Sequence, residues 1–147
     1  MKYPLVAYSW TAMSPNTVFK RMDKSTFIHR GTGVPKQLSG FFNIPDGDML
    51  SPLNISLHLD GKTYDARIEM DALHSRYRLF WLSDFTQEIQ RRFPDHYDIF
   101  KNGKGIGEDK CPTMRFDRIG DDTYSVSWEV PDEDSLPTHE ESTLNQR

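Results

Sequence analysis

Two segments in the second half of the chain contain the residue types that magnesium-dependent nucleases use. Asp95 precedes the triplet Glu108-Asp109-Lys110. Two carboxylates can hold Mg²⁺, and a lysine beside them can stabilise negative charge on a phosphate under attack. Such nucleases place the triplet on a strand, whereas here it follows the Gly-rich run 103–107, which favours a solvated loop. We therefore expect no catalysis in this chain itself, and we keep a stand-alone Mg-dependent nuclease using Asp95, Glu108 and Lys110 as an alternative.

Two other segments have the composition of nucleic-acid contacts. Residues 20–36 carry five Lys and Arg residues against Asp23 alone, and residues 74–78 form a short basic stretch. Lys and Arg neutralise phosphates, while Ser, Thr, Asp and His side chains can read base edges. Two basic loops on one fold could grip both walls of a major groove of double-stranded DNA. The candidate DNA-binding residues are Lys20, Asp23, Lys24, Ser25, Thr26, His29, Arg30, Thr32, His74, Ser75, Arg76 and Arg78.

The net charge of −4 does not exclude nucleic acid, because it is confined to the end of the chain. Residues 131–147 contain five acids and one arginine, so residues 1–130 are neutral as a whole. A neutral body with a basic segment can bind DNA even where an acidic tail follows it. We predict one domain over residues 1–130 and an acidic tail or linker over residues 131–147.

Composition also limits the compartment and the cofactors. The single cysteine excludes an internal disulfide, and the sequence has neither a signal peptide nor an apolar run of membrane-spanning length. We therefore expect a cytoplasmic protein with no membrane segment. The five histidines are dispersed without the spacing of zinc ligands, so we expect no metal site and no cofactor. Mg²⁺ would matter only if a nuclease domain is present elsewhere.

Most of the chain has the pattern of short strands separated by turns. Ile55, Leu57 and Leu59 alternate with polar residues, which predicts a strand with one buried face, and Asp60-Gly61 is a strong hairpin signal. Residues 3–10 are expected to form a strand or an N-terminal arm, and the other expected strands cover residues 16–22, 54–59, 62–70, 76–81, 114–119 and 123–130. The expected helices cover residues 36–42, after Pro35, and residues 83–92, with Ser83 as N-cap, and residues 98–112 are expected to form a loop. The predicted fold class is mainly β (α+β), an open barrel of about seven strands with two short helices.

The order of these features resembles the B3-like DNA-binding pseudobarrel family. This family includes the EcoRII N-terminal effector domain, the BfiI C-terminal domain and the plant B3-type transcription factors. In the family, a Lys-Arg-hydrophobic strand end leads into a polar arm and then a Pro-initiated helix. The corresponding segments here are Lys20-Arg21-Met22, residues 23–33 and Val34-Pro35, followed by a hairpin at 53–70, a second basic arm at 71–77, a strand ending in Trp81 and a last hairpin at 115–126. The resemblance covers roughly residues 16–130 and leaves residues 1–15 unexplained.

The resemblance implies a wrench-like grip on DNA. The first arm, residues 23–33, and the second arm, residues 71–78, would enter the major groove from its two sides and contact a short sequence. Arg30, Lys24 and Arg76 would contact phosphates or guanine edges. The chain would then be the recognition domain of a type II restriction endonuclease, with a nuclease domain following the acidic tail.

Two further hypotheses use aromatic residues. The first is a reader of modified bases, in which a pocket for a flipped base would contain Tyr77, Trp81 or Tyr97, unless these residues belong to the core. The second is a protein-interaction barrel that binds no nucleic acid and uses Tyr8, Trp10 and the acidic tail. A complete absence of DNA binding at low salt would favour this last alternative.

Overall fold

The computed structural model describes residues 2–45 and 51–131, so all of the predicted acidic tail except Pro131 lies outside the described residues. The strands are β1 (Leu5–Ala7), β2 (Trp10–Ser14), β3 (Thr17–Arg21), β4 (Gly31–Val34), β5 (Leu53–Leu59), β6 (Lys62–Asp71), β7 (Arg76–Trp81), β8 (Thr113–Gly120) and β9 (Thr123–Glu129). The helices are α1 (Lys24–Ile28), α2 (Ser83–Arg92) and α3 (Pro94–Lys101), with short 3₁₀ segments η1 (Lys36–Leu38), η2 (Ala72–His74) and η3 (Glu108–Lys110). Among these described residues, no helix has the length and apolar character needed to cross a membrane.

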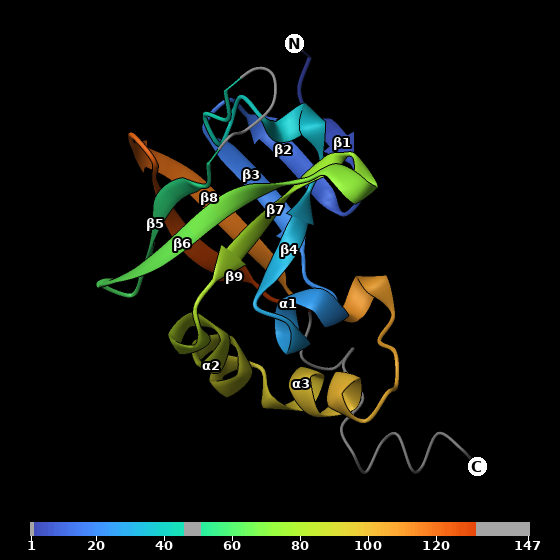
Figure 1. Ribbon diagram of the computed structural model, residues 1–147. Coiled ribbons are helices and arrows are strands. Elements are labelled where there is room, and N and C mark those ends of the chain that lie inside the picture. Colours follow the sequence, from blue (N-terminus) through green and yellow to red (C-terminus); the bar gives the residue numbers. More distant parts are fainter. Residues whose placement is uncertain (1, 46–50, 132–147) are drawn as a thin grey trace, which may run out of the picture.

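The strands form one curled, open sheet in the order β1-β2-β3-β8-β9-β5-β6-β7-β4 (Figure 1). Neighbouring strands are antiparallel, except that β5 and β9 run parallel. At the two ends of the sheet, the indole N–H of Trp10 donates a hydrogen bond to the carbonyl of Gly33 at 2.9 Å. A side chain thus joins β2 to β4 where no strand pairing closes the barrel. The predicted mainly β, open fold is confirmed, but the described residues form nine strands rather than about seven and three α-helices rather than two.

One of the two additional strands arises because the predicted strand 3–10 is interrupted. β1 and β2 pair through Ala7 and Trp10, which leaves Tyr8 and Ser9 as a two-residue turn. Tyr8 has a φ of 58°, a left-handed conformation that Gly or Asn adopts more readily. No such residue marks this turn in the sequence, so the pattern indicated a single strand, and that prediction is wrong.

The other additional strand and one helix lie inside the first arm, which is predicted as a loop. The carboxylate of Asp23 accepts the backbone N–H of Thr26 at 3.3 Å, and the Thr26 hydroxyl accepts the N–H of Asp23 at 2.9 Å. This reciprocal cap starts α1. Phe27 is fully buried, with its ring stacked at 5.7 Å on His96 and at 5.4 Å on Phe100 of α3. The arm then continues as β4, which pairs with β7, so the loop prediction is wrong for most of the arm.

The three α-helices gather at one end of the sheet (Figure 1). Phe85 and Ile89 of α2 are buried, and the N-cap of this helix is Leu82 rather than the predicted Ser83. Pro94 begins α3, because proline lacks only an N–H that the first helical turn leaves unpaired. The loop predicted over residues 98–112 is therefore wrong as far as Lys101, where α3 ends.

The core confirms the alternation expected in the central hairpin. Ile55, Leu57 and Leu59 are all buried, as are Leu38, Phe41 and Phe42 of the segment predicted as a helix. Only η1 and the turns after it are helical there, so this segment is shorter than predicted. Burial of this core fixes the curvature of the sheet and thereby the distance between its two ends.

Candidate nucleic-acid interface

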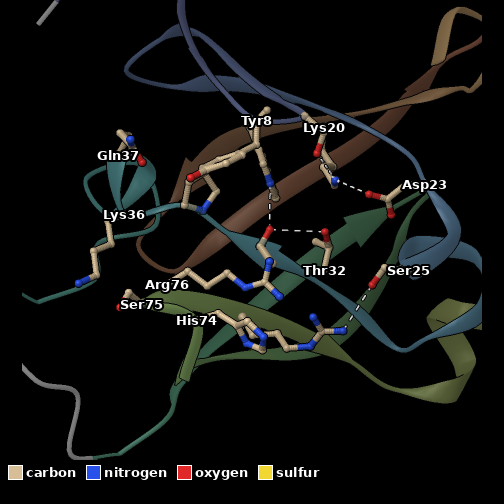
Figure 2. A pocket seen from close by; sticks show the side chains of 15 residues that line it. Tyr8, Lys20, Asp23, Ser25, Thr32, Lys36, Gln37, His74, Ser75 and Arg76 are labelled. Atoms are coloured by element: carbon tan, nitrogen blue, oxygen red, sulfur yellow. Dashed lines mark hydrogen bonds and ion pairs between the residues drawn. The ribbon is translucent and has the colours of Figure 1, made fainter. Parts of the chain in front are cut away.

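A cavity of about 820 Å³ lies where the two ends of the sheet approach each other (Figure 2). Its walls come from the β1–β2 turn, β3, the start of α1, β4, η1 and the second arm. The structure therefore brings parts of both arms to one place, although they are far apart in the sequence. Eight of the twelve candidate DNA-binding residues line this cavity: Lys20, Asp23, Ser25, Thr32, His74, Ser75, Arg76 and Arg78.

The other four candidates do not line the cavity. Lys24, His29 and Arg30 are exposed on the first arm. Thr26 is fully buried, and its hydroxyl donates to the carbonyl of Asp23 at 2.7 Å while accepting the N–H of the same residue. The Thr26 side chain thus caps α1 and presents no free polar atom to a ligand.

Ser25 connects the first arm with the second. Its hydroxyl donates to the carbonyl of Gly31 at 3.1 Å and accepts a hydrogen bond from Nη2 of Arg78 at 3.4 Å. The guanidinium of Arg78 also lies over the ring of Phe80, 5.5 Å from its centroid. Arg78 is thus oriented by neutral groups, and its positive charge is left available to an anion.

One carboxylate organises the second arm. Asp71 caps η2 by accepting the backbone N–H of His74 at 3.4 Å, and its Oδ2 lies 2.9 Å from Nδ1 of His74 and 3.3 Å from Nε of Arg76. Partial burial acts to raise the pKa of Asp71, but these hydrogen bonds outweigh it and hold the pKa below its ordinary value. Ser75, at the tip, has a φ of 51° and reverses the chain.

Lys20 lies at the inner wall of the cavity with a relative exposure of 2%. Its ammonium group donates to the hydroxyl of Ser9 and to Oδ2 of Asp23, the latter at 3.1 Å, and lies 5.8 Å from the ring centroid of Trp10. Burial lowers the pKa of Lys20, and the neighbouring Asp23 carboxylate opposes that effect. The cavity therefore contains a positive charge that is largely shielded from water.

Arg76 reaches the cavity across a residue without a side chain. A Cβ atom on Gly33 would lie 2.6 Å from Nη1 of Arg76, closer than real contacts allow. Glycine at this position of β4 thus gives the guanidinium room to lie against the strand backbone. The sequence alone does not show that Gly33 makes room for Arg76. That contact arises because β4 pairs with β7, with Gly33 opposite Arg78, two residues after Arg76.

Charge is distributed differently over the cavity and over the rest of the surface. Asp23 is the only acid among the residues of the cavity wall, against the cations Lys20, Lys36, Arg76 and Arg78. Lys36 and Arg78 form no salt bridge within the part of the chain that the structure describes. Elsewhere, five arginines are paired with carboxylates: Arg21, Arg67, Arg91, Arg92 and Arg115. Lys20 and Arg76 are paired with Asp23 and Asp71, so the unpaired positive charge at the cavity comes from Lys36 and Arg78. Positive charge beside a concave surface attracts anions.

Sequence reasoning did not place the β1–β2 turn or η1 at this cavity. Tyr8, Ser9 and Trp10 line it from one side, and Lys36 and Gln37 line it from another. The sequence contains no signal that places Tyr8, Ser9 and Trp10 at the cavity, because they reach it only where the two ends of the sheet approach each other. The basic character of Lys36 is visible in the sequence, and it is the one signal that could have extended the first arm to η1.

The residues of the nuclease alternative do not form a comparable cluster. Asp95 is exposed in the first turn of α3, and Oε1 of Glu108 lies 3.3 Å from Nη2 of Arg21. The carbonyl of Lys110 lies 2.9 Å from Nε2 of His96. Within residues 2–45 and 51–131, no group of three or more His, Cys, Asp or Glu side chains could hold a metal ion. The geometry therefore gives no support to metal-dependent cleavage by these residues.

The aromatic residues considered for a modified-base pocket are not at the cavity. Tyr77 and Trp81 are buried in the core, and the Trp81 indole N–H donates to the Thr86 hydroxyl at 3.0 Å. Tyr97 is partly buried on α3, with the ammonium of Lys101 5.6 Å from its ring centroid. Tyr77 and Trp81 thus belong to the core, the alternative that the sequence left open for them.

Comparisons with known proteins do not assign the chain to a family. No protein-family model matches the sequence, and no curated protein matches it. Among solved structures, the chain is similar to the N-terminal domain of Helicobacter pylori LlaJI.R1, with a TM-score of 0.48 and 14% identity over 89% of each chain. It is also similar to a hypothetical protein of Arabidopsis thaliana, with a TM-score of 0.43 and 11% identity over 79% of this chain and 91% of that one. Scores at this level decide neither family nor function, so the interpretation of the cavity rests on its geometry.

Proposed function

We propose that this protein binds double-stranded DNA in a sequence-specific manner, with the two arms entering the major groove on either side of the cavity. The observation that supports this most directly is the convergence of both arms on one cavity with four cations and one acid in its wall. DNA presents a dense row of phosphates, and neutralising them supplies much of the affinity of a DNA-binding protein. Neutral polar groups between the cations supply the means to discriminate bases.

The proposal gives the predicted residues different roles. The cations that contact phosphates or guanine edges are Lys36, Arg76 and Arg78 at the cavity, and Lys24 and Arg30 beyond it on the first arm. The residues that read base edges or complete phosphate contacts are Asp23, Ser25, His29, His74 and Ser75. Lys20 and Thr32, both nearly buried, support the cavity wall, and Thr26 has no direct contact because its buried side chain caps α1.

We extend the proposal to the recognition part of a restriction endonuclease, as the resemblance of the sequence implies, and we keep the cytoplasmic location expected from composition. Cleavage of DNA would belong to a nuclease domain on another segment, with Mg²⁺ required only there. A plasmid incubated with the pure chain and Mg²⁺ should remain intact, and cleavage abolished by Glu108→Ala would contradict this part.

The first experiment is selection from a pool of duplexes with a randomised centre, followed by sequencing of the bound fraction. A sequence-specific protein should enrich one short motif. The affinity for that motif should then be measured at several salt concentrations for the wild type, Arg78→Ala and Arg91→Ala. Loss of one phosphate contact should reduce the slope of log affinity against log salt by about 0.9.

Arg91→Ala is the matched control, because Arg91 is exposed on α2 and paired with Glu88, away from the cavity. We expect Arg78→Ala to weaken binding and flatten the salt slope, while Arg91→Ala leaves both close to the wild type. Equal behaviour of the two variants would place the DNA elsewhere on the protein. A lack of binding to every duplex at low salt would favour the protein-interaction barrel instead.

A further inference from the structure

The β1–β2 turn displays an aromatic side chain at the rim of the cavity. Tyr8 has a relative exposure of 86%, although most tyrosines bury part of their ring. Its φ of 58° is in the left-handed region, which a bulky residue occupies only when the surrounding structure holds it there. Figure 2 shows Tyr8 on one side of the hollow and His74, Ser75 and Arg76 on the other. The fold thus presents an unpacked ring where it gives no benefit to the core.

The size of the hollow does not fit a stacked duplex alone. A duplex gripped by the two arms would rest on their tips, and the space of about 820 Å³ behind them would be left to water. Cavities of this size typically enclose a small molecule. A single nucleotide turned out of the duplex is small enough to enter the hollow.

The chemistry of the wall also matches a nucleotide. Tyr8 offers a flat face on which a base can stack, which is favourable for every base. The hydroxyl of Ser9 and the amide of Gln37 offer neutral hydrogen-bonding groups to a base edge. Arg76 and Arg78, on the opposite wall, would lie beside the phosphates that flank the displaced base.

We propose that the cavity receives one unstacked nucleotide of the bound DNA, with its base against Tyr8. This inference rests on the proposed function, because the nucleotide comes from the duplex held by the two arms. The inference gives the N-terminal segment a role. In it, Tyr8 takes the part that the sequence analysis considered for Tyr77 and Trp81, which are buried in the core. The free energy needed to turn a base out of the duplex is lower when that base is mismatched.

The test compares duplexes that differ only in pairing at one position. A single mismatch is moved step by step through the sequence obtained by selection, or through any bound duplex if no motif is enriched. We expect the wild type to bind one of the mismatched duplexes at least about tenfold more tightly than the paired duplex, because unpairing costs a few kcal/mol. Tyr8→Ala should lose this preference and bind that duplex roughly fivefold to a hundredfold more weakly, the range for loss of one base–aromatic stack.

Two control variants separate stacking from other effects. Tyr8→Phe keeps the ring and should retain the preference, and Ile119→Ala removes another exposed apolar side chain, outside the cavity, and should change nothing. Because Tyr8 is exposed, Tyr8→Ala should fold as the wild type does, which a thermal melt verifies. Equal affinity for the paired duplex and for every mismatched form of it, or a mismatch preference that survives in Tyr8→Ala, would overturn this inference and leave the proposed function standing. No binding to any duplex would overturn both.

Discussion

The two arms face the same cavity, but different forces hold them in place. The first arm is anchored by Phe27, which has no exposed surface and stacks on His96 and Phe100 of α3. The turn of the second arm, η2, contains no buried residue. It is held by the carboxylate of Asp71, which binds the backbone of the arm and two of its side chains.

This difference determines how each wall of the cavity can respond to a ligand. Apolar burial is insensitive to salt and requires the core to open before the first arm moves. Hydrogen bonds and ion pairs at the surface are weak in water and exchange readily for others. We therefore expect the first arm to be a fixed wall, and the second arm to adjust its His74 and Arg76 side chains when an anion binds.

The largest expected effect is on the anchored arm. Phe27→Ala removes a fully buried ring and should lower the free energy of unfolding by about 3–5 kcal/mol, measured by urea denaturation. Leu73→Ala is the matched control on the second arm, because Leu73 is 88% exposed and should change that free energy by less than about 0.5 kcal/mol. Similar costs for both substitutions would show that the two arms are supported in the same way.

The second prediction concerns the polar support. Asp71→Ala removes the acceptor of three hydrogen bonds and should lower the thermal midpoint at neutral pH by a few degrees. Because the pKa of Asp71 is below its ordinary value in the folded protein, its contribution is present above the unfolded pKa of about 3.9. That contribution is lost as the pH falls through the folded pKa.

The measurement is the difference in thermal midpoint between the wild type and Asp71→Ala over a range of acidic pH. The difference should be constant near neutrality and vanish in strong acid. Asp65→Ala, an exposed aspartate on β6, serves as control and should leave the midpoint at neutral pH unchanged. A difference that persists at the lowest pH would show that the Asp71 contribution does not depend on its charge.

The same contrast explains which parts of the molecule could be predicted from the sequence. The strands with alternating side chains, such as β5 with Ile55, Leu57 and Leu59, follow from local pattern, because each residue records which face of the strand is buried. The second arm was expected between two such strands, and the structure forms only the short η2 between β6 and β7. Its charge also identified it as a candidate interface.

The first arm could not be derived in this way, because its structure depends on distant partners. Phe27 and Ile28 stand in an otherwise polar stretch, and the rings on α3 that pack against Phe27 come much later in the chain. β4 has only four residues and pairs with β7, so its strand character is set by the partner rather than by its own pattern. The cavity itself requires both ends of the sheet to meet, which no local signal in the sequence records.

The smallest expected effect on stability belongs to Gly33 of the first arm, and Gly31, two residues before it, is the comparison. A Cβ on Gly31 would lie 2.1 Å from the carbonyl oxygen of Leu79, so Gly31→Ala must separate β4 from β7. It should cost about 1–3 kcal/mol of stability. A Cβ on Gly33 would meet the guanidinium of Arg76, the far end of a flexible side chain that can move away. Gly33→Ala should therefore change stability by less than about 1 kcal/mol.

Gly33→Ala should act on DNA binding instead, because the displaced guanidinium of Arg76 no longer lies along the cavity wall. The salt slope of binding should fall by up to about 0.9 relative to the wild type, the loss of one phosphate contact. If the second arm adjusts as we expect, Arg76 will recover part of that contact, and the reduction will be smaller than in Arg76→Ala. A reduction as large as that of Arg76→Ala would mean that the second arm is as rigid as the first. The two arms would then differ in how they are anchored but not in how they move when DNA binds.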